Sequence, residues 1–347
     1  MTIKNIFILG GGGHGITLLT KYLISSKSNF QIYYNTTDWG GSQGLWGRML
    51  ELNNFELERQ LFNTTESFLP FADLNKTLIE FSRHSSRKDN LEDLNHRSHS
   101  LKEALAEFTK LANVLGLKLQ DELAFKGQMK QIWAFNYKNR PKIKYFKEIC
   151  FGYFWHQRLF NKTKNIKDWN KYWQDLGFLP HNVDLKFSQD IRTTLIATDI
   201  NLTAVISEEV IDFHKQPFLA DQVFIQSKDL RSELPLSQEF LNDLRAADVV
   251  LIPSGTICNW IGFCNYGLVR NILGKKKLVW LCNPRKSRNE LPIKDYYEFL
   301  VKINPEVVAL TSIKKQVNFG MKVLELDENG KHDPDQMAEV LHEVLEG

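Results

Sequence analysis

The hydrophobic pattern at the N-terminus predicts the opening of a βαβ unit. Ile6–Leu9 is an apolar run that ends at Gly10, Ile16–Ile24 carries apolar residues at helical spacing, and Phe30–Tyr34 is a second apolar run. An apolar run, a glycine turn, a helical period and another apolar run are typical of this unit. A polar, Gly-rich stretch follows, from residue 35 to residue 47.

Later segments continue the alternation of strands and helices. Leu69–Phe81 has a helix-start signature, with Asp73 before an apolar-periodic run, and Leu101–Leu115 is amphipathic. From residue 193 the pattern predicts two strands joined by a turn near residues 199–201. A helix, a strand at Val249–Ile252, a Ser-Gly loop, a helix and a strand at Lys277–Cys282 come next. This order predicts an α/β fold of three-layer, Rossmann-like type with a mainly parallel sheet.

The middle of the chain has a different character. Between residues 125 and 173, lysines and arginines are interleaved with many aromatic residues. A surface for single-stranded nucleic acid would combine these residue types, but no RNA-binding motif occurs there. We therefore favour an inserted subdomain with an aromatic core. The predicted organisation is a nucleotide-binding core in two halves, 1–115 and 190–347, with a helical, aromatic-rich insertion at 116–189.

Composition narrows the classes of function. The chain of 347 residues is 43% hydrophobic and 24% charged, as in an ordinary globular protein. A net charge of +3 is too small to indicate a nucleic-acid or membrane partner, and the N-terminal apolar run is too short for a signal or a membrane span. The four cysteines lack metal-binding or disulfide spacing. We expect a cytoplasmic protein.

Two glycine loops predict a phosphate cradle. Gly10, Gly12 and Gly15 satisfy GxGxxG before a helix, a pattern compatible with NAD, nucleotides, nucleotide sugars or a plain tight turn. In the second loop, "NTTDWGGSQG", Asp38 lies within a Gly-Gly-Ser run rather than at a strand end. A carboxylate beside phosphates requires a bridging cation, so Asp38 is predicted to hold Mg²⁺ or orient substrate; a simple loop cap is the alternative. Arg48 is placed either to neutralise phosphate or to face solvent.

Two further loops follow strands of the second half. "PSGT" at Pro253–Thr256 is a candidate anion site before a helix, and "CNPRKSRNE" places Asn283 and a basic cluster near the same edge of the sheet. His96 and His99 are spaced for metal binding, but such pairs near a helix start are more often surface or capping residues. The sequence has no HExxH motif.

Taken together, these loops resemble the 2-phospho-L-lactate transferase family (CofD-like), which includes the YvcK-type gluconeogenesis factors. "GGGGHG" and "NTTDWGGSQG" resemble GGGTG and NTxDDGGxSG; "LPFADLNKTL" resembles LPPGDIRNCL, and "SHSLKEAL" resembles GHSLGNLLL. "AADVVLIPSGTICNWI" resembles ADLIVLGPGSLYTSI, and "LVWLCNPRKSRNE" resembles VYVCNVMTQPGET. The resemblance covers residues 6–115 and 193–290. His14 replaces the threonine of the first motif, and Trp39 replaces the second acid of the Asp-Asp pair.

The resemblance implies a site for a nucleoside-diphosphate-linked ligand, either GDP-linked or UDP-linked. It assigns the catalytic and metal-binding role to Asp38 and Asp73, with Mg²⁺ as cofactor. The residues predicted for ligand binding, from the loops and the resemblance together, are Gly11, Gly12, Gly13, His14, Asn35, Trp39, Gly40, Gly41, Ser42, Arg48, His99, Ser254, Gly255, Thr256 and Asn283.

Two functions remain open at this point. The first is transfer of a phosphate-linked, 2-phospholactate-like group to an alcohol acceptor such as a deazaflavin. The second is non-catalytic binding of a UDP-sugar by a YvcK-like regulator. A nicotinamide-dependent oxidoreductase is a third, less favoured class. The acceptor, the base recognised and the oligomeric state stay open, with a homodimer as one candidate.

Overall fold

A computed structural model places most of the two core halves. The residues that it describes are 3–10, 13–35, 71–85, 91–95, 97–98, 102–103, 106, 109–110, 149–150, 156, 159, 163, 165–189, 193–206, 210–211, 214–227, 235–255, 257–284, 290–312, 321–326 and 330–346. Among these residues, no helix is both long and apolar enough to cross a bilayer.

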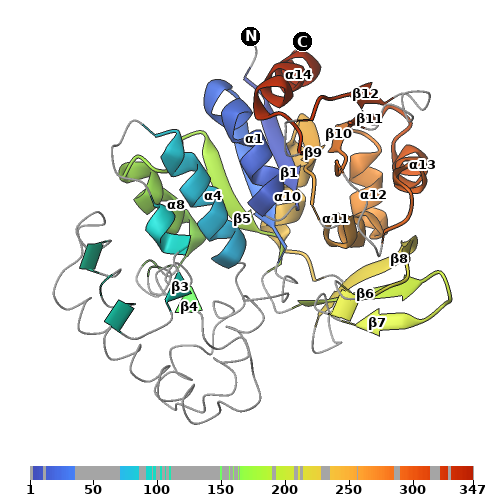
Figure 1. The fold of residues 1–347 in the computed structure, drawn as a ribbon. Helices are drawn as coiled ribbons and strands as arrows, with labels where there is room; N and C mark the ends of the chain where they lie inside the picture. Colours follow the sequence, from blue (N-terminus) through green and yellow to red (C-terminus); the bar gives the residue numbers. More distant parts are fainter. Residues whose placement is uncertain are drawn as a thin grey trace.

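A sheet of seven parallel strands forms the centre of the molecule (Figure 1). Its spatial order is β12-β11-β10-β9-β1-β2-β5. The strands are β1 (Asn5–Leu9), β2 (Asn29–Tyr34), β5 (Val183–Phe187), β9 (Val249–Ile252), β10 (Lys277–Leu281), β11 (Val308–Thr311) and β12 (Lys322–Val323). From β1 the chain adds strands in one direction through β2 to β5, then returns to the other side of β1 with β9. This reversal is the hallmark of a doubly wound sheet.

Helices cover both faces of this sheet, which makes three layers. Along β1, Ile6 and Ile8 belong to one hydrophobic core, whereas Phe7 and Leu9 belong to a second one. The first core includes residues of α1 (Gly13–Ser25), α4 (Phe71–Arg83), α8 (Ile166–Asp175) and α14 (Pro334–Glu346). The second includes residues of α10 (Gln238–Ala246), α11 (Ile257–Cys264), α12 (Gly267–Leu273) and α13 (Ile293–Ile303).

Local sequence explains where several of these elements begin. The side chain of Ser237 accepts a hydrogen bond from the Phe240 amide at 3.1 Å and caps α10, and Asn165 caps α8 through the Asp168 amide at 2.8 Å. Such caps satisfy amide groups that have no partner within the helix. Val249–Ile252 is buried along its whole length, as expected for a strand covered on both faces.

A small antiparallel sheet lies beside the carboxyl ends of the central strands (Figure 1). It contains β6 (Thr193–Asp199), β7 (Ala204–Ile206) and β8 (Phe218–Ser227). The predicted strand pair is confirmed, with Thr198 opposite Ala204. The sheet packs closely on α11, because a Cβ atom at Gly262 would lie only 2.8 Å from Ile225 Cγ1. The remaining described elements are η2 (Glu92–Asn95), β3 (Arg97–Ser98) and β4 (Ile149–Cys150).

The central sheet extends into the range that the sequence assigned to the insertion. β5 lies within 116–189, yet it pairs with β2 from Phe30↔Val183 to Tyr34↔Phe187. Its polar members hid it from the hydrophobic pattern: Lys186 is paired with Asp243 at 2.6 Å and Glu239 at 2.8 Å. α8 lies in the same range, and its two tryptophans are fully buried in the first core. These two aromatic residues therefore pack in the core beside the central sheet, and the inserted subdomain with an aromatic core of its own stays a prediction.

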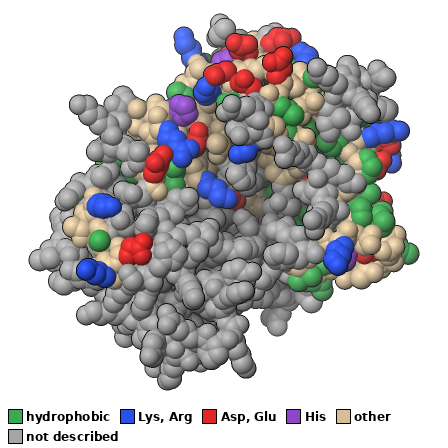
Figure 2. Space-filling model, viewed as in Figure 1, with side chains coloured by type: hydrophobic (Ala, Val, Ile, Leu, Met, Phe, Trp, Pro, Cys, Tyr) green, Lys and Arg blue, Asp and Glu red, His purple; other side chains and the backbone are tan. Residues whose placement is uncertain are grey.

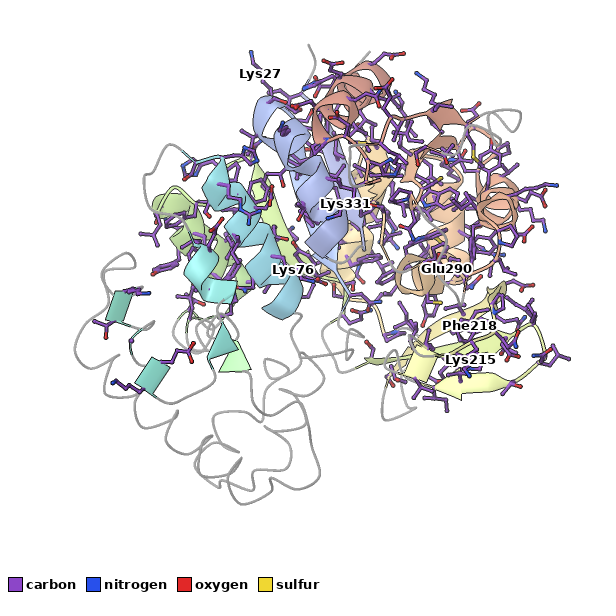
Figure 3. All side chains as sticks on the ribbon, in the orientation of Figure 1. Lys27, Lys76, Lys215, Phe218, Glu290 and Lys331 are labelled. Carbon is purple, nitrogen blue, oxygen red and sulfur yellow. The ribbon has the colours of Figure 1, made fainter. Side chains whose placement is uncertain are left out.

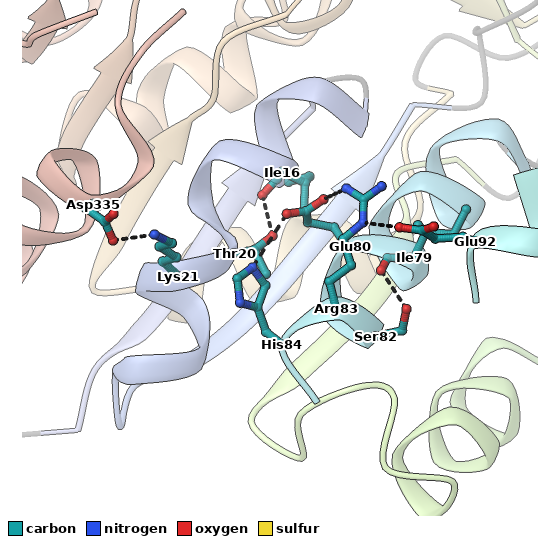
Figure 4. A network of polar contacts seen from close by, with 10 residues as sticks. All are labelled: Ile16, Thr20, Lys21, Ile79, Glu80, Ser82, Arg83, His84, Glu92 and Asp335. Atoms are coloured by element: carbon teal, nitrogen blue, oxygen red, sulfur yellow. Dashed lines mark hydrogen bonds and ion pairs between the residues drawn. The ribbon is translucent and has the colours of Figure 1, made fainter. Parts of the chain in front are cut away.

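Polar contacts join α14 and η2 to the first helical layer (Figure 4). Lys21 of α1 forms an ion pair with Asp335 of α14. Arg83 at the end of α4 pairs with Glu80 at 2.8 Å and with Glu92 of η2 at 3.1 Å. Figure 2 shows acidic side chains gathered at the end of the molecule where α14 lies. The C-terminal helix is thus held on α1 by both apolar and charged contacts.

Candidate functional site

The topology singles out the carboxyl ends of β1 and β9. The strands are parallel neighbours, with Ile6 opposite Val249 and Ile8 opposite Leu251. The chain leaves β1 toward α1 on one face, and it leaves β9 toward α11 on the other face. Diverging connections open a crevice at the carboxyl ends of the two strands, and ligands of doubly wound proteins bind there. Gly10 and the loop of Pro253, Ser254 and Gly255 both lie at this point.

Gly10 makes the turn out of β1. Its backbone has φ +70°, a left-handed conformation that side-chain-bearing residues rarely adopt. Its amide donates a hydrogen bond to the Tyr33 carbonyl at 3.1 Å. A Cβ atom would find ordinary contact distance there, 3.5 Å from Trp260 Cβ. Backbone conformation, rather than space, therefore requires glycine at this position.

Gly15 allows the start of α1 to lie directly against the loop that follows β9. A Cβ atom on Gly15 would lie 2.2 Å from the carbonyl oxygen of Ser254 and 2.9 Å from Pro253 Cβ. The first turns of α1 therefore approach the β9 loop as closely as backbone atoms allow. This is the role of the third glycine in GxGxxG, which permits close helix packing. The last glycine of the predicted GxGxxG motif is therefore in direct contact with the predicted loop after β9.

Asn283 connects the loop after β10 to the loop after β9. Its Nδ2 donates to the Gly255 carbonyl at 2.8 Å, and its Oδ1 accepts from the Gly255 amide at 2.8 Å. Nδ2 also lies 3.4 Å from Oε1 of Glu290, a buried residue beside α11 (Figure 3). Both functional atoms of the amide side chain thus hold the Gly255 peptide. The described contacts make Asn283 a positioning residue, and its predicted contact with a nucleotide stays a prediction.

His332 stabilises the end of β10, where the loop that carries Asn283 begins. It is fully buried, and its Nε2–H donates to the carbonyl of Cys282 at 2.8 Å. Burial lowers the pKa of His332 below its ordinary value, although the hydrogen bond to Cys282 opposes this shift. A neutral imidazole therefore fixes the end of β10, one residue before Asn283.

A buried polar chain marks the carboxyl ends of β2 and β5. Asn35 Oδ1 accepts from Gln189 Nε2 at 2.9 Å, and Gln189 Oε1 accepts from the Ser188 hydroxyl at 2.5 Å. The amide of Ser188 donates to the Tyr34 carbonyl at 3.0 Å. Asn35, Ser188 and Gln189 are all buried. Gln189 therefore holds the predicted residue Asn35 in place, and Ser188 in turn holds Gln189. The sequence pattern indicates neither of these two residues.

Asp73 lies in the first turn of α4, close to the end of β2. It is buried, and a carboxylate is favourable at this end of a helix. Burial raises the pKa of the Tyr34 phenol far above its ordinary value; the hydrogen bond with Thr77, at 2.6 Å, opposes the shift, and the Asp73 charge adds to it. The Tyr34 hydroxyl consequently stays protonated beside the carboxylate.

This chain matches known proteins in three-dimensional structure but not in sequence. No family model matches this sequence, and no curated protein matches it. Two crystal structures of protein BH3568 from Bacillus halodurans, one described as a member of the UPF0052 family, superpose with TM-scores of 0.63 and 0.57. Each is 14% identical in sequence, and each match covers 98% of this chain and 99% of that one. This chain shares that fold. The predicted α/β class with a mainly parallel sheet is confirmed.

Within that fold, the described site residues are Asn35, Asp73, Ser254, Gly255 and Asn283, and Gly13 and His14 begin α1. Other predicted site residues lie outside the described residues: Gly11, Gly12, Asp38, Trp39, Gly40, Gly41, Ser42, Arg48, His99 and Thr256. The described part of the chain holds no group of three or more His, Cys, Asp or Glu arranged for a metal.

Proposed function

We propose that this chain binds a nucleoside-diphosphate-linked small molecule in the crevice between β1 and β9. The observation that carries the proposal is the junction of three loops, in which Gly15 touches Ser254 and Asn283 clasps Gly255. The helices α1 and α11 begin beside this junction, and the amides of a helix N-terminus suit the two adjacent negative charges of a diphosphate.

The family resemblance supports a more specific proposal. UPF0052, the family of the structural neighbour, is the CofD/YvcK family, and the loops of this chain resemble the motifs of that family in the same order. We infer a transferase that moves a phosphate-linked group from the nucleotide to an alcohol acceptor such as a deazaflavin. The reaction is attack by the acceptor hydroxyl on phosphorus, with departure of the nucleotide.

Mg²⁺ fits the one described member of the proposed metal pair. Asp73 offers carboxylate oxygens at the carboxyl edge of the sheet, and Mg²⁺ is commonly held by one or two carboxylates together with phosphate oxygens and water. When bound, the ion would neutralise charge on the transferred group. Asp73 itself would orient the ion or the acceptor, with Asp38 as its proposed partner.

The alternative is a UDP-sugar-binding regulator without catalysis. Trp39, which stands in place of the second acid of the family motif, is the observation that favours it. An aromatic side chain stacks on a base or a sugar ring but supplies no metal ligand. The two proposals share the same cradle and differ in whether a group is transferred once the ligand is bound.

Calorimetry with GDP, UDP-N-acetylglucosamine and NAD, each with and without Mg²⁺, tests the ligand class. We expect binding of a diphosphate nucleotide, strengthened by Mg²⁺ if Asp38 and Asp73 hold the ion. Binding of NAD alone would overturn the proposal. Gly15→Ala should weaken nucleotide binding, whereas Gly267→Ala is the matched control, because a Cβ atom there meets nothing within 4 Å.

A second assay separates the transferase from the regulator. The chain is incubated with the nucleotide-linked donor, a deazaflavin acceptor and Mg²⁺, and the products are followed by mass spectrometry. Transfer of the phosphate-linked group supports the enzyme. Metal-independent binding of a UDP-sugar with no transferred product would support the regulator instead.

A further inference from the structure

Ser25, His342 and Glu346 form a hydrogen-bonded chain where the ends of α1 and α14 meet. Ser25 Oγ lies 2.9 Å from His342 Nε2, and His342 Nδ1 lies 2.9 Å from Glu346 Oε2. A hydroxyl, an imidazole and a carboxylate therefore follow one another in the order used for nucleophilic catalysis. Such a triad is recognised by its geometry and roles, whatever the order of its members along the chain.

The carboxylate is fixed from its other side. Glu346 Oε1 accepts hydrogen bonds from the Ser26 hydroxyl and, at 3.3 Å, from the Tyr22 hydroxyl. Burial by itself raises the pKa of Glu346, but hydrogen bonds from Ser26, His342 and Tyr22, together with electrostatic attraction to His342, outweigh burial and hold the pKa below its ordinary value. An ionised carboxylate accepts the Nδ1–H of His342. In that tautomer, Nε2 faces the Ser25 hydroxyl as an acceptor.

Packing keeps the imidazole in this orientation. The rings of Tyr22 and His342 meet edge to face with their centroids 4.9 Å apart. The carboxylate side chain is 9% exposed and the imidazole 34% exposed, and Ser25 lies at the surface. The Ser25 hydroxyl has a second, more distant acceptor, the Tyr22 carbonyl at 3.2 Å. The chain thus runs from a fixed interior carboxylate to a hydroxyl that solvent can reach.

We propose that Ser25 is the nucleophile of a second site, separate from the nucleotide crevice, that reacts with small carboxylic esters. His342 acts as general base, and Glu346 is the positioning residue. Ser25 Oγ bonds to the acyl carbon while its proton passes to His342 Nε2; the ester C–O bond breaks, and the alkoxide takes that proton. Water then attacks the acyl-serine with His342 again as base, releasing the acid and restoring the hydroxyl.

The site is at the opposite end of α1 from the glycine loop. The helix has 13 residues, so its ends lie roughly 18 Å apart at a rise of about 1.5 Å per residue. Lys27 follows at the same end (Figure 3). The C-terminus of α1 carries partial negative charge, which disfavours an oxyanion. We therefore expect slow turnover, and covalent labelling of Ser25 is the sensitive measurement.

The test is labelling of the full chain with a fluorophosphonate probe, followed by intact mass and peptide mapping. We expect a single adduct on Ser25, and Ser25→Ala should abolish it. Ser85 is the matched control residue, because it follows the end of α4 and donates in the same way to the carbonyl three residues before it, at 2.9 Å. Ser85→Ala should leave the labelling unchanged.

Two variants test the roles of the other members. His342→Gln and Glu346→Gln should each slow labelling of Ser25 by at least about tenfold, with unchanged far-UV circular dichroism. Glu346→Gln should also remove the far-downfield proton NMR signal of a histidine Nδ1–H bound to carboxylate, while Ser25→Ala should retain it. No adduct on Ser25 in the parent chain, or labelling that is indifferent to both variants, overturns the proposal. Nucleotide binding should be unaffected in Ser25→Ala, so the two proposals fail independently.

Discussion

Substitution of Gly15 by alanine tests the junction of the loops most directly. The added Cβ atom would lie 2.2 Å from the Ser254 carbonyl oxygen and 2.9 Å from Pro253 Cβ, whereas real Cβ contacts shorter than 3.0 Å are essentially absent. The obstacles are a backbone atom and a proline ring, so no flexible side chain can rotate away. Either α1 or the β9 loop must shift.

The size of the effect reflects two opposing contributions. Overpacking of this kind costs about 1–3 kcal/mol, while alanine in place of glycine favours a helix by up to about 1 kcal/mol. We expect a net loss of up to about 2 kcal/mol in the free energy of unfolding. Because the shift separates the glycine loop from Ser254, nucleotide affinity should fall by at least about tenfold, which corresponds to about 1.4 kcal/mol.

Urea denaturation and calorimetry on the same preparations measure both effects. Gly267→Ala is the matched control: its Cβ atom is placed in open space at the first residue of α12, so its stability should be unchanged or slightly increased. If Gly15→Ala were as stable as Gly267→Ala and bound nucleotide like the parent chain, the close contact between α1 and the β9 loop would be refuted.

Three further predictions concern single side chains. Asn283→Leu removes both hydrogen bonds to Gly255 and should lower the free energy of unfolding by about 1–3 kcal/mol, measured by urea denaturation; an unchanged midpoint would contradict the clasp. Because the pKa of Glu346 is lowered in the folded state, its contribution to stability is present above its ordinary pKa and is lost as pH falls through the lower, folded value. Acid titration followed by circular dichroism should therefore show a smaller loss of stability for Glu346→Gln than for the parent. Asp73→Asn should remove the effect of Mg²⁺ on nucleotide binding in calorimetry, and an unchanged Mg²⁺ effect would exclude Asp73 as a ligand.

Burial decides which strands the sequence could predict. The hydrophobic pattern predicts the strand Val249–Ile252 with its exact limits, because all four residues are buried and apolar. Val183–Phe187 was missed because it lies at the edge of the sheet, where Asp184 and Lys186 are only partly buried. Lys186 is tolerated because two carboxylates of α10 neutralise it. Such a pairing depends on residues more than 50 positions away in the chain, and no local pattern carries that information.

The same reasoning applies to the candidate site. Parallel strands end at one edge of a sheet, so the sequence could predict that the loops after β1, β9 and β10 lie near one another. It could not predict that Gly15 touches Ser254 or that Asn283 holds Gly255, since these contacts depend on the packing of α1 and on strand order. Ser188 and Gln189 were missed together with β5. Polar residues directly after a strand were the signal that could have found them once that strand was recognised.

Different groups of the proposed site would bind the phosphates and select the base or sugar of the ligand. The proposed phosphate-binding groups are main-chain amides at the start of α1, and main-chain amides recognise charge and shape in a phosphate without distinguishing one base or sugar from another. We therefore expect the proposed cradle to bind diphosphate ligands with little regard to their base or sugar. Choice among ligands must come from side chains around it, and the buried chain from Asn35 to Gln189 fixes one such group at the end of β2. For this reason, substitutions of the glycines should change the affinity for all diphosphate nucleotides alike. Asn35→Ala should instead change the ratio of the affinities for GDP and UDP-N-acetylglucosamine. An equal loss of affinity for both ligands would show that selectivity comes from other residues.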